Sequence, residues 1–167
     1  MTTTLDVGRY LRPGLLIGDK DLTSGSAGMF DHVNPATGKV QQSVVMAGAD
    51  DVDRAVEAAR LGQAEWRRWK PEARRRALTK VADAIRAHTE EVAMVQALEN
   101  GIPLAMAREV MVPLGADWFE HAASWADKLE GQVIPTAPEE VLDYTLLEPV
   151  GVVAVIAPWN FPLAIAT

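Results

Sequence analysis

Residues 148–162 constrain the fold of this chain more than any other stretch. They read EPVGVVAVIAPWNFP. Residues 151–157 are apolar and rich in β-branched side chains, a composition typical of a parallel strand covered on both faces. Pro158 ends the run because proline cannot donate to a strand ladder. The stretch predicts a buried strand in an α/β sheet, followed by a turn.

Two prolines enclose the polar turn that follows this predicted strand. Pro158 lies at its start, and Pro162 restricts the preceding residue, Phe161, to extended backbone. Trp159 and Asn160 therefore lie in a short segment held at both ends. The segment sits at the carboxyl edge of a strand, where open α/β sheets bind ligands.

Asn160 is the one residue to which we assign direct chemistry. Its carboxamide offers N–H donors without changing protonation state, so at a fixed position it can stabilise an oxygen that gains negative charge in a transition state. The alternative is a hydrogen bond to the turn backbone, which is the commoner role of an isolated asparagine at a strand end.

The region before this stretch changes from extended to helical. Strand candidates lie at 15–17 and 44–46. Helical spacing of apolar residues, with capping residues and proline at helix starts, predicts four helices. The first begins after a cap at Asp50, and the second begins at Pro71. The third begins after a cap at Thr89 and stops at Gly101. The fourth begins near 112 and extends to about 129.

Residues 132–149 have the pattern of a β-hairpin. Two strand-like runs, 133–135 and 141–147, flank a turn rich in proline and glutamate. Leu142 and Leu146 fall on one face of the second run, so that strand is apolar on one side. From the pattern alone, the hairpin could pack on its own domain.

Composition and net charge disfavour or exclude several classes of function. The chain has 167 residues, 49% of them hydrophobic, which is enough for one domain with a sizeable core. Its net charge of -7 disfavours binding to nucleic acid. The absence of cysteine excludes a disulfide framework and a thiolate metal site, and the three histidines lack the spacing of metal ligands. We expect no metal.

Localisation follows from two segments. Residues 1–9 lack the apolar core of a signal peptide, so a cytoplasmic protein is expected. Residues 149–167 carry no charge and approach the length of a membrane span. Glycine and proline break them at Gly151, Pro158 and Pro162, so they predict a strand and a turn rather than a spanning helix.

The chain resembles the aldehyde dehydrogenase superfamily over nearly its whole length, from about Gly14 onward. The matching motifs, in family order, are NPATGKV at 34–40, DVDRAVEAAR at 51–60, Pro71 with Arg74, ENGIPL at 99–104, WADK at 125–128 with Gly131, and 148–162. The resemblance covers only the amino-terminal minority of a family member. It implies an α/β fold in which a helical layer joins the beginning of a Rossmann-like parallel sheet, with a protruding β-hairpin, as an incomplete domain.

The resemblance also implies a division of the chain and an assembly. Residues 1–131 match the amino-terminal part of the cofactor-binding domain, and 150–167 match its first core strand and turn. Residues 132–149 match the hairpin that pairs with another subunit, which implies homo-oligomers, dimers or tetramers. The implied activity is NAD(P)-dependent oxidation of an aldehyde to a carboxylic acid through a cysteine thiohemiacetal and thioester.

Four residues match functional positions of the family. Asn160 matches the asparagine that stabilises the thiohemiacetal oxyanion. Ile156 and Trp159 match positions beside the nicotinamide dinucleotide, and Phe161 matches a wall of the aldehyde passage. Core packing is the alternative for the apolar positions, and a buried Ile156 would line a cofactor only through its backbone.

Oxidation through a thioester needs a thiolate, and this chain contains no cysteine. We therefore expect the chain alone to be inactive and its binding of NAD or NADP to be doubtful. The apolar end, LAIAT at 163–167, suggests an interrupted chain. The alternative function is a noncatalytic interaction or regulatory module derived from the same family.

Overall fold

Four short strands come first in the described part of the chain and form two separate antiparallel pairs. In the computed structural model, which describes residues 14–137 and 140–167, β1 (Leu15–Ile17) pairs with β2 (Lys20–Leu22). β3 (Met29–Val33) pairs with β4 (Val40–Val45), and Met29 lies opposite Val45. The strand predicted at 15–17 is confirmed. Residues 1–13, which include the segment used to predict localisation, lie outside the described residues.

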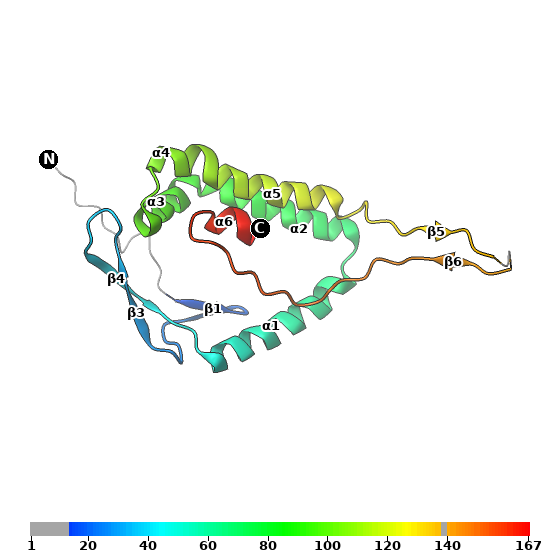
Figure 1. Cartoon of the computed structure of the whole chain (residues 1–167), viewed down its shortest axis with the longest axis horizontal. Coiled ribbons are helices and arrows are strands. Elements are labelled where there is room, and N and C mark those ends of the chain that lie inside the picture. Colours follow the sequence, from blue (N-terminus) through cyan, green and yellow to red (C-terminus); the bar gives the residue numbers. More distant parts are fainter. Residues whose placement is uncertain (1–13, 138–139) are drawn as a thin grey trace.

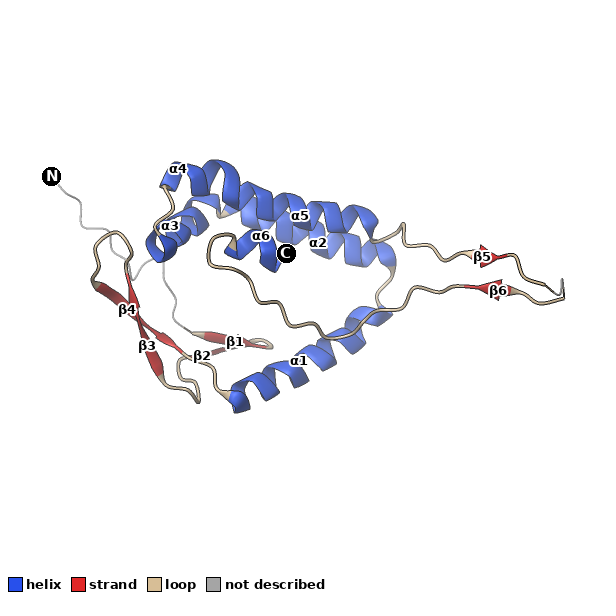
Figure 2. Cartoon of the chain, viewed as in Figure 1, coloured by secondary structure: helices blue, strands red, loops and turns tan. Residues whose placement is uncertain are grey.

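Helices make up most of the remaining described chain (Figure 2). They are α1 (Ala49–Arg68), α2 (Pro71–Ala87), α3 (Thr89–Asn100), α4 (Leu104–Met106), the π-helical turn η2 (Ala107–Met111), α5 (Val112–Trp125) and α6 (Pro162–Ala166). The predicted start of α2 and the stop of α3 at Gly101 are confirmed. Thr89 does not cap α3, because its hydroxyl donates to the carbonyl of Arg86 at the end of α2, 2.8 Å away.

The start of α1 differs from the prediction by a few residues. Gly48, not Asp50, is the N-cap, and the capping side chain is that of Asp51. The Asp51 carboxylate is only 1% exposed and accepts from Ser26 N at 2.6 Å, Ser26 Oγ at 2.7 Å and Gly48 N at 3.0 Å, while Arg54 pairs with its other oxygen. These hydrogen bonds hold the pKa of Asp51 well below its usual range, and the bond from the Ser26 backbone has the largest effect.

A proline explains the irregular helix that leads into α5. Pro113 has no N–H, and its ring would clash with the carbonyl four residues earlier in a regular helix. The widened turn η2 immediately precedes it, and Val112 N bonds to Ala107 O, five residues back. The predicted helix near 112–129 is therefore the later part of a longer helical run, which ends at Trp125.

The described core lies where α3, η2 and α5 meet. Its centre is formed by Ala93, Ala107 and Val112, all fully buried. Larger side chains pack around these three: Ile85, Val92, Ile102, Leu104 and Leu163. α2 and α5 run side by side, and α6 lies against α5 (Figure 1). The last helix is thus fastened to the helical layer.

Residues 132–149, called the arm below, extend away from the helices (Figure 1). Within the arm, β5 (Val133–Ile134) pairs antiparallel with β6 (Asp143–Tyr144), and Thr145 N donates to Gln132 O at 2.8 Å. The strands are shorter than predicted. Residues 138–139 of the predicted turn lie outside the described residues.

The prediction of a buried strand at 151–157 is wrong for this structure. The segment is unpaired and exposed, and it runs between α1 and the α2 and α5 pair (Figure 1). Over 14–137 and 140–167 all strand pairs are antiparallel. A parallel strand becomes buried only when neighbouring strands flank it. The fold described is a mixture of helices and short strands, and the Rossmann-like sheet stays a prediction.

Candidate functional site

Residues 158–162 form a tight turn that leads directly into α6. Phe161 N donates to Pro158 O at 3.3 Å, which closes the turn around Trp159 and Asn160. Pro162 is the first residue of α6, where a missing N–H costs no hydrogen bond. Phe161 is the N-cap of α6, with φ of -138° and ψ of 55°. Its ψ therefore departs from the fully extended value predicted for a residue before proline.

Two contacts fasten this turn to the helical layer, one on each side of Asn160. Before it, Asn100 Nδ2 at the end of α3 donates to the carbonyl of Trp159 at 2.9 Å. After it, Leu163 of α6 packs against the core and lies over Gly115 of α5. A Cβ on Gly115 would lie 2.6 Å from Leu163 Cγ, closer than nonbonded carbon atoms approach. Glycine at this position is what lets α6 dock so closely.

The structure brings three of the four predicted site residues together in the turn. Asn160 is exposed, and no described residue hydrogen-bonds its side chain. Trp159 is 76% exposed and Phe161 is 37% exposed. Ile156 lies upstream on the extended segment with a side chain that is 93% exposed, so it can meet a ligand through its side chain as well as its backbone. Their roles stay predictions.

Sequence reasoning missed the residues that hold the turn. Asn100 was noted only as part of the family motif ENGIPL, and no role was predicted for Gly115 or Leu163. The contact between Asn100 and Trp159 joins residues 59 apart, and no spacing pattern reports such a contact. A weak signal existed at Gly115, because glycine in the interior of a helix costs stability and usually has a packing reason.

The polar surroundings of Asn100 include Glu99 and His32. Partial desolvation raises the pKa of Glu99 above its ordinary value, while the nearby His32 opposes this shift. Among residues 14–137 and 140–167, no three His, Asp or Glu side chains are grouped so that they could hold a metal ion. In the same ranges, no helix is both long and apolar enough to cross a membrane.

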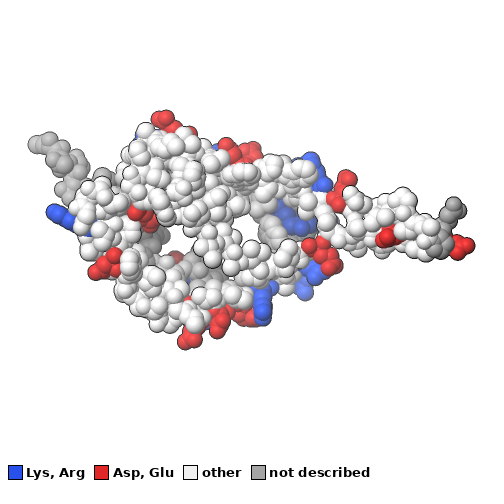
Figure 3. All heavy atoms as spheres, in the orientation of Figure 1, with Lys and Arg blue, Asp and Glu red and all other residues white. Residues whose placement is uncertain are grey.

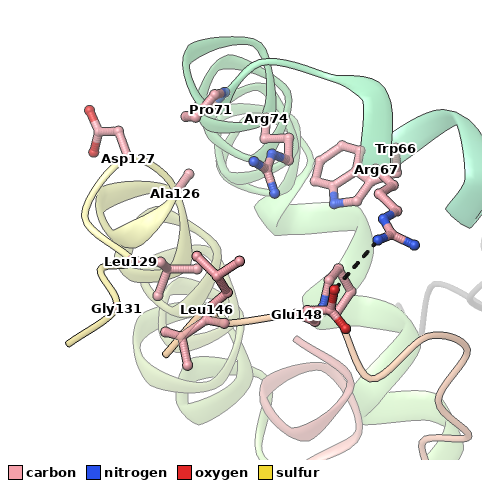
Figure 4. A pocket seen from close by; sticks show the side chains of 12 residues that line it. Trp66, Arg67, Pro71, Arg74, Ala126, Asp127, Leu129, Gly131, Leu146 and Glu148 are labelled. Carbon is pink, nitrogen blue, oxygen red and sulfur yellow. Dashed lines mark ion pairs between the residues drawn. The ribbon is translucent and has the colours of Figure 1, made fainter. Parts of the chain in front are cut away.

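A cavity of about 490 Å³ lies at the base of the arm, and none of the predicted site residues lines it. Trp66 and Arg74 line it from the α1 and α2 side, and Leu129 and Leu146 line it from the other side (Figure 4). Arg67 points across its edge toward Glu148, and the two form an ion pair of 3.9 Å. Exposed pairs of this kind contribute little stability.

Charge is unevenly distributed over the face drawn in Figure 3. Basic side chains gather where α1 and α2 meet the base of the arm, whereas acidic side chains are spread around the outline. Two basic side chains share one acidic partner: Arg75 lies 3.9 Å from Asp127, and Lys128 lies 3.1 Å from the same carboxylate. This basic cluster is partly neutralised and lies apart from the turn.

Comparison with known proteins gives one consistent family. The family model described as the aldehyde dehydrogenase family matches residues 22–167. An aldehyde dehydrogenase of Alternaria alternata is 40% identical over 163 residues, which make up 96% of this chain and 33% of that protein. The chain spans about a third of the length of the curated relatives it matches.

Solved structures of similar proteins have the same fold as this chain over the residues that match. A variant of an aldehyde dehydrogenase from Bacillus cereus matches with a TM-score of 0.88 and 34% identity, over 99% of this chain and 34% of that one. PnpE in complex with nicotinamide adenine dinucleotide matches with a TM-score of 0.87 and 36% identity, over 93% of this chain and 32% of that one.

Proposed function

Because this chain belongs to the aldehyde dehydrogenase family, we propose that it is the amino-terminal part of an NAD(P)-dependent enzyme that oxidises an aldehyde to a carboxylic acid. The observation that carries this proposal is the family match over residues 22–167, which includes the turn that presents Asn160. Residues 1–131 and 150–167 would contribute to the cofactor-binding domain.

Asn160 would act on the oxygen of the aldehyde. Attack of a cysteine thiolate on the carbonyl carbon forms a thiohemiacetal whose oxygen carries negative charge. The exposed carboxamide of Asn160 can donate an N–H to this oxygen, and it does so without exchanging a proton. A donor aimed at such an oxyanion contributes roughly 10²–10³ in kcat when the site excludes water.

Ile156 and Trp159 would lie beside the nicotinamide end of NAD or NADP. Their side chains are exposed and apolar, which suits a flat ring, and the peptide groups of 151–157 have no ladder partners among the described residues. NAD or NADP bound there would supply the acceptor for a hydride from the substrate carbon. Phe161, on the other side of Asn160, would form a wall of the aldehyde passage.

The chain cannot complete this cycle from its own residues, because it contains no cysteine to form the thioester. The nucleophile must come from other residues of the complete protein. We therefore expect the 167 residues alone to be inactive. A noncatalytic module of the same family is the outcome to be distinguished from this proposal.

The arm would join copies of the complete protein. Several of its apolar side chains are exposed, among them Val133, Leu142 and Leu146. Apolar side chains on a projecting pair of strands gain stability when another chain covers them. We expect a homodimer or a homotetramer built through the arm.

The test uses the translated product of the complete reading frame that contains this chain. Intact-mass measurement on the native protein establishes its length, and aldehyde-dependent formation of NADH measures activity. Asn160→Ala should lower kcat by about 10²–10³. Glu65→Ala is the control, because it removes an exposed polar side chain from α1 and should leave kcat unchanged. A protein that ends at Thr167 and produces no NADH would favour the noncatalytic module.

A further inference from the structure

The backbone of the turn is held by one side chain from outside it. Asn100 Nδ2 donates to the carbonyl oxygen of Trp159 at 2.9 Å, and over the described residues no other side chain bonds the backbone of 158–161. The carbonyl of Trp159 and the amide of Asn160 belong to one planar peptide unit. A bond that fixes this carbonyl therefore fixes the direction in which the Asn160 backbone leaves the turn.

The side chain of Asn100 is itself fixed in orientation. Its Oδ1 accepts from Ile102 N at 3.3 Å, which leaves the amino group facing Trp159. Gly101 makes this arrangement possible, since it has φ of 73°, a left-handed conformation that glycine adopts readily. A Cβ on Gly101 would also lie only 3.1 Å from Pro35 Cγ. Both ends of the Asn100 carboxamide are thus engaged.

The helix end that carries Asn100 rests on the β3 and β4 pair. The last carbonyls of a helix lack partners within it. Here Gln41 Nε2 donates to Leu98 O at 2.8 Å, and His32 Nε2 lies 3.1 Å from Glu99 O. The second N–H of Gln41 faces His32 Nδ1 at 2.9 Å.

These bonds are mutually consistent for one form of the imidazole. A neutral His32 with its proton on Nε2 donates to the carbonyl of Glu99 and accepts from Gln41 at Nδ1. Asn34 Nδ2 completes the set by donating to Gln41 Oε1 at 2.7 Å. Three polar side chains of β3, β4 and their connection thereby hold the end of α3 in place.

We propose that Asn100 is a positioning residue for the reaction, which sets the orientation of Asn160 by holding the Trp159 carbonyl. This inference rests on the proposed role of Asn160 as the oxyanion donor. A donor must lie within about 2.7–3.1 Å of the oxyanion to act, so a small rotation of the peptide unit weakens it. Asn100 supplies no group to the substrate and acts through the turn alone.

The test is a double-mutant cycle on kcat in the product of the complete reading frame. Asn100→Asp retains the acceptor for Ile102 N and replaces the donor to Trp159 with an oxygen that repels its carbonyl. We expect kcat to fall about tenfold in Asn100→Asp. In an Asn160→Ala background the same change should alter kcat less than twofold, because the group that Asn100 orients is gone.

Two further variants separate positioning from other effects. Ala64→Glu adds the same negative charge at an exposed position of α1 and should leave kcat unchanged in both backgrounds. Asn100→Ala removes both hydrogen bonds without adding charge and should reproduce the coupling with Asn160. A purely structural role would lower the thermal midpoint equally in both backgrounds and leave kcat uncoupled.

Each result decides between the two proposals. If Asn160→Ala retains wild-type kcat, the oxyanion role fails and the positioning role falls with it. If Asn160→Ala loses activity but Asn100→Asp costs the same factor in both backgrounds, or costs nothing in either, only the positioning role is overturned. If neither Asn100 variant folds, Asn100 is a structural residue, and the positioning role is overturned as well.

Discussion

Replacing Gly115 with alanine tests how α6 and the turn before it are docked. The ideal Cβ at Gly115 lies 2.6 Å from Leu163 Cγ and 2.8 Å from Leu163 Cδ2. Nonbonded carbons prefer roughly 3.5–4.0 Å, so the shortfall is about 1 Å. Leu163 must move out of its place against the core, and with it the helix that follows Asn160.

Two opposing terms set the size of the effect. Overpacking of a well-packed site costs about 1–3 kcal/mol, and replacing glycine with alanine inside a helix gains about 1 kcal/mol. Gly115→Ala should therefore lower the free energy of unfolding by about 1 kcal/mol. In a Leu163→Ala background only the Cβ of residue 163 remains, 3.6 Å away, which is ordinary contact. In this background, Gly115→Ala should raise the free energy of unfolding by about 1 kcal/mol.

Gly62→Ala is the matched control. Gly62 lies inside α1 with no other atoms within 4 Å of its ideal Cβ, so alanine there should stabilise by about 1 kcal/mol in either background. Urea unfolding followed by far-ultraviolet circular dichroism measures all of these variants. The reasoning is refuted if Gly115→Ala stabilises the protein as Gly62→Ala does while Leu163 is present, since Leu163 then does not fill the space over Gly115.

Two further predictions concern the start of α1 and the arm. Asp51→Asn should lower the thermal midpoint at pH 7. Folding lowers the pKa of Asp51, so its carboxylate contributes to the free energy of unfolding above the unfolded pKa of about 3.9. This contribution is lost as the pH falls below that value. The difference between wild type and variant should narrow from pH 7 to pH 3, and parallel curves would contradict this. Leu142→Glu should reduce the assembled mass measured by light scattering, whereas Leu61→Glu, at an exposed leucine of α1, should not; equal masses for both would rule out assembly through the arm.

Features set by local sequence were predicted well. Pro71 begins α2 because proline suits the first turn of a helix, and Gly101 ends α3 because its left-handed φ of 73° is accessible to glycine. The prediction of a cap at Asp50 is wrong, because Gly48 is the N-cap and Asp51 supplies the carboxylate that bonds it. Asp50 and Asp51 are both acidic residues near the helix start, and only the fold shows which one meets Ser26.

Features that depend on distant partners could not be predicted. The apolar pattern of 151–157 indicates a strand that suits burial, but burial requires neighbouring strands, and none of the described strands pairs with it. The same limit applies to the turn. The pattern around Asn160 indicated a constrained segment, and the partners that constrain it, Asn100 and Leu163, lie on separate helices.

The helical layer, rather than the extended segment, sets the place of Asn160. The segment before the turn is unpaired, so it cannot fix the turn by itself. Asn100 holds the peptide that precedes Asn160, and Leu163 is anchored three residues after it in the core of Ala93 and Val112. Both anchors lead to the same packed helices, so a displacement of either one should move the carboxamide. Changes at Asn100 or at Gly115 are therefore expected to move the same side chain, which we propose as the oxyanion donor.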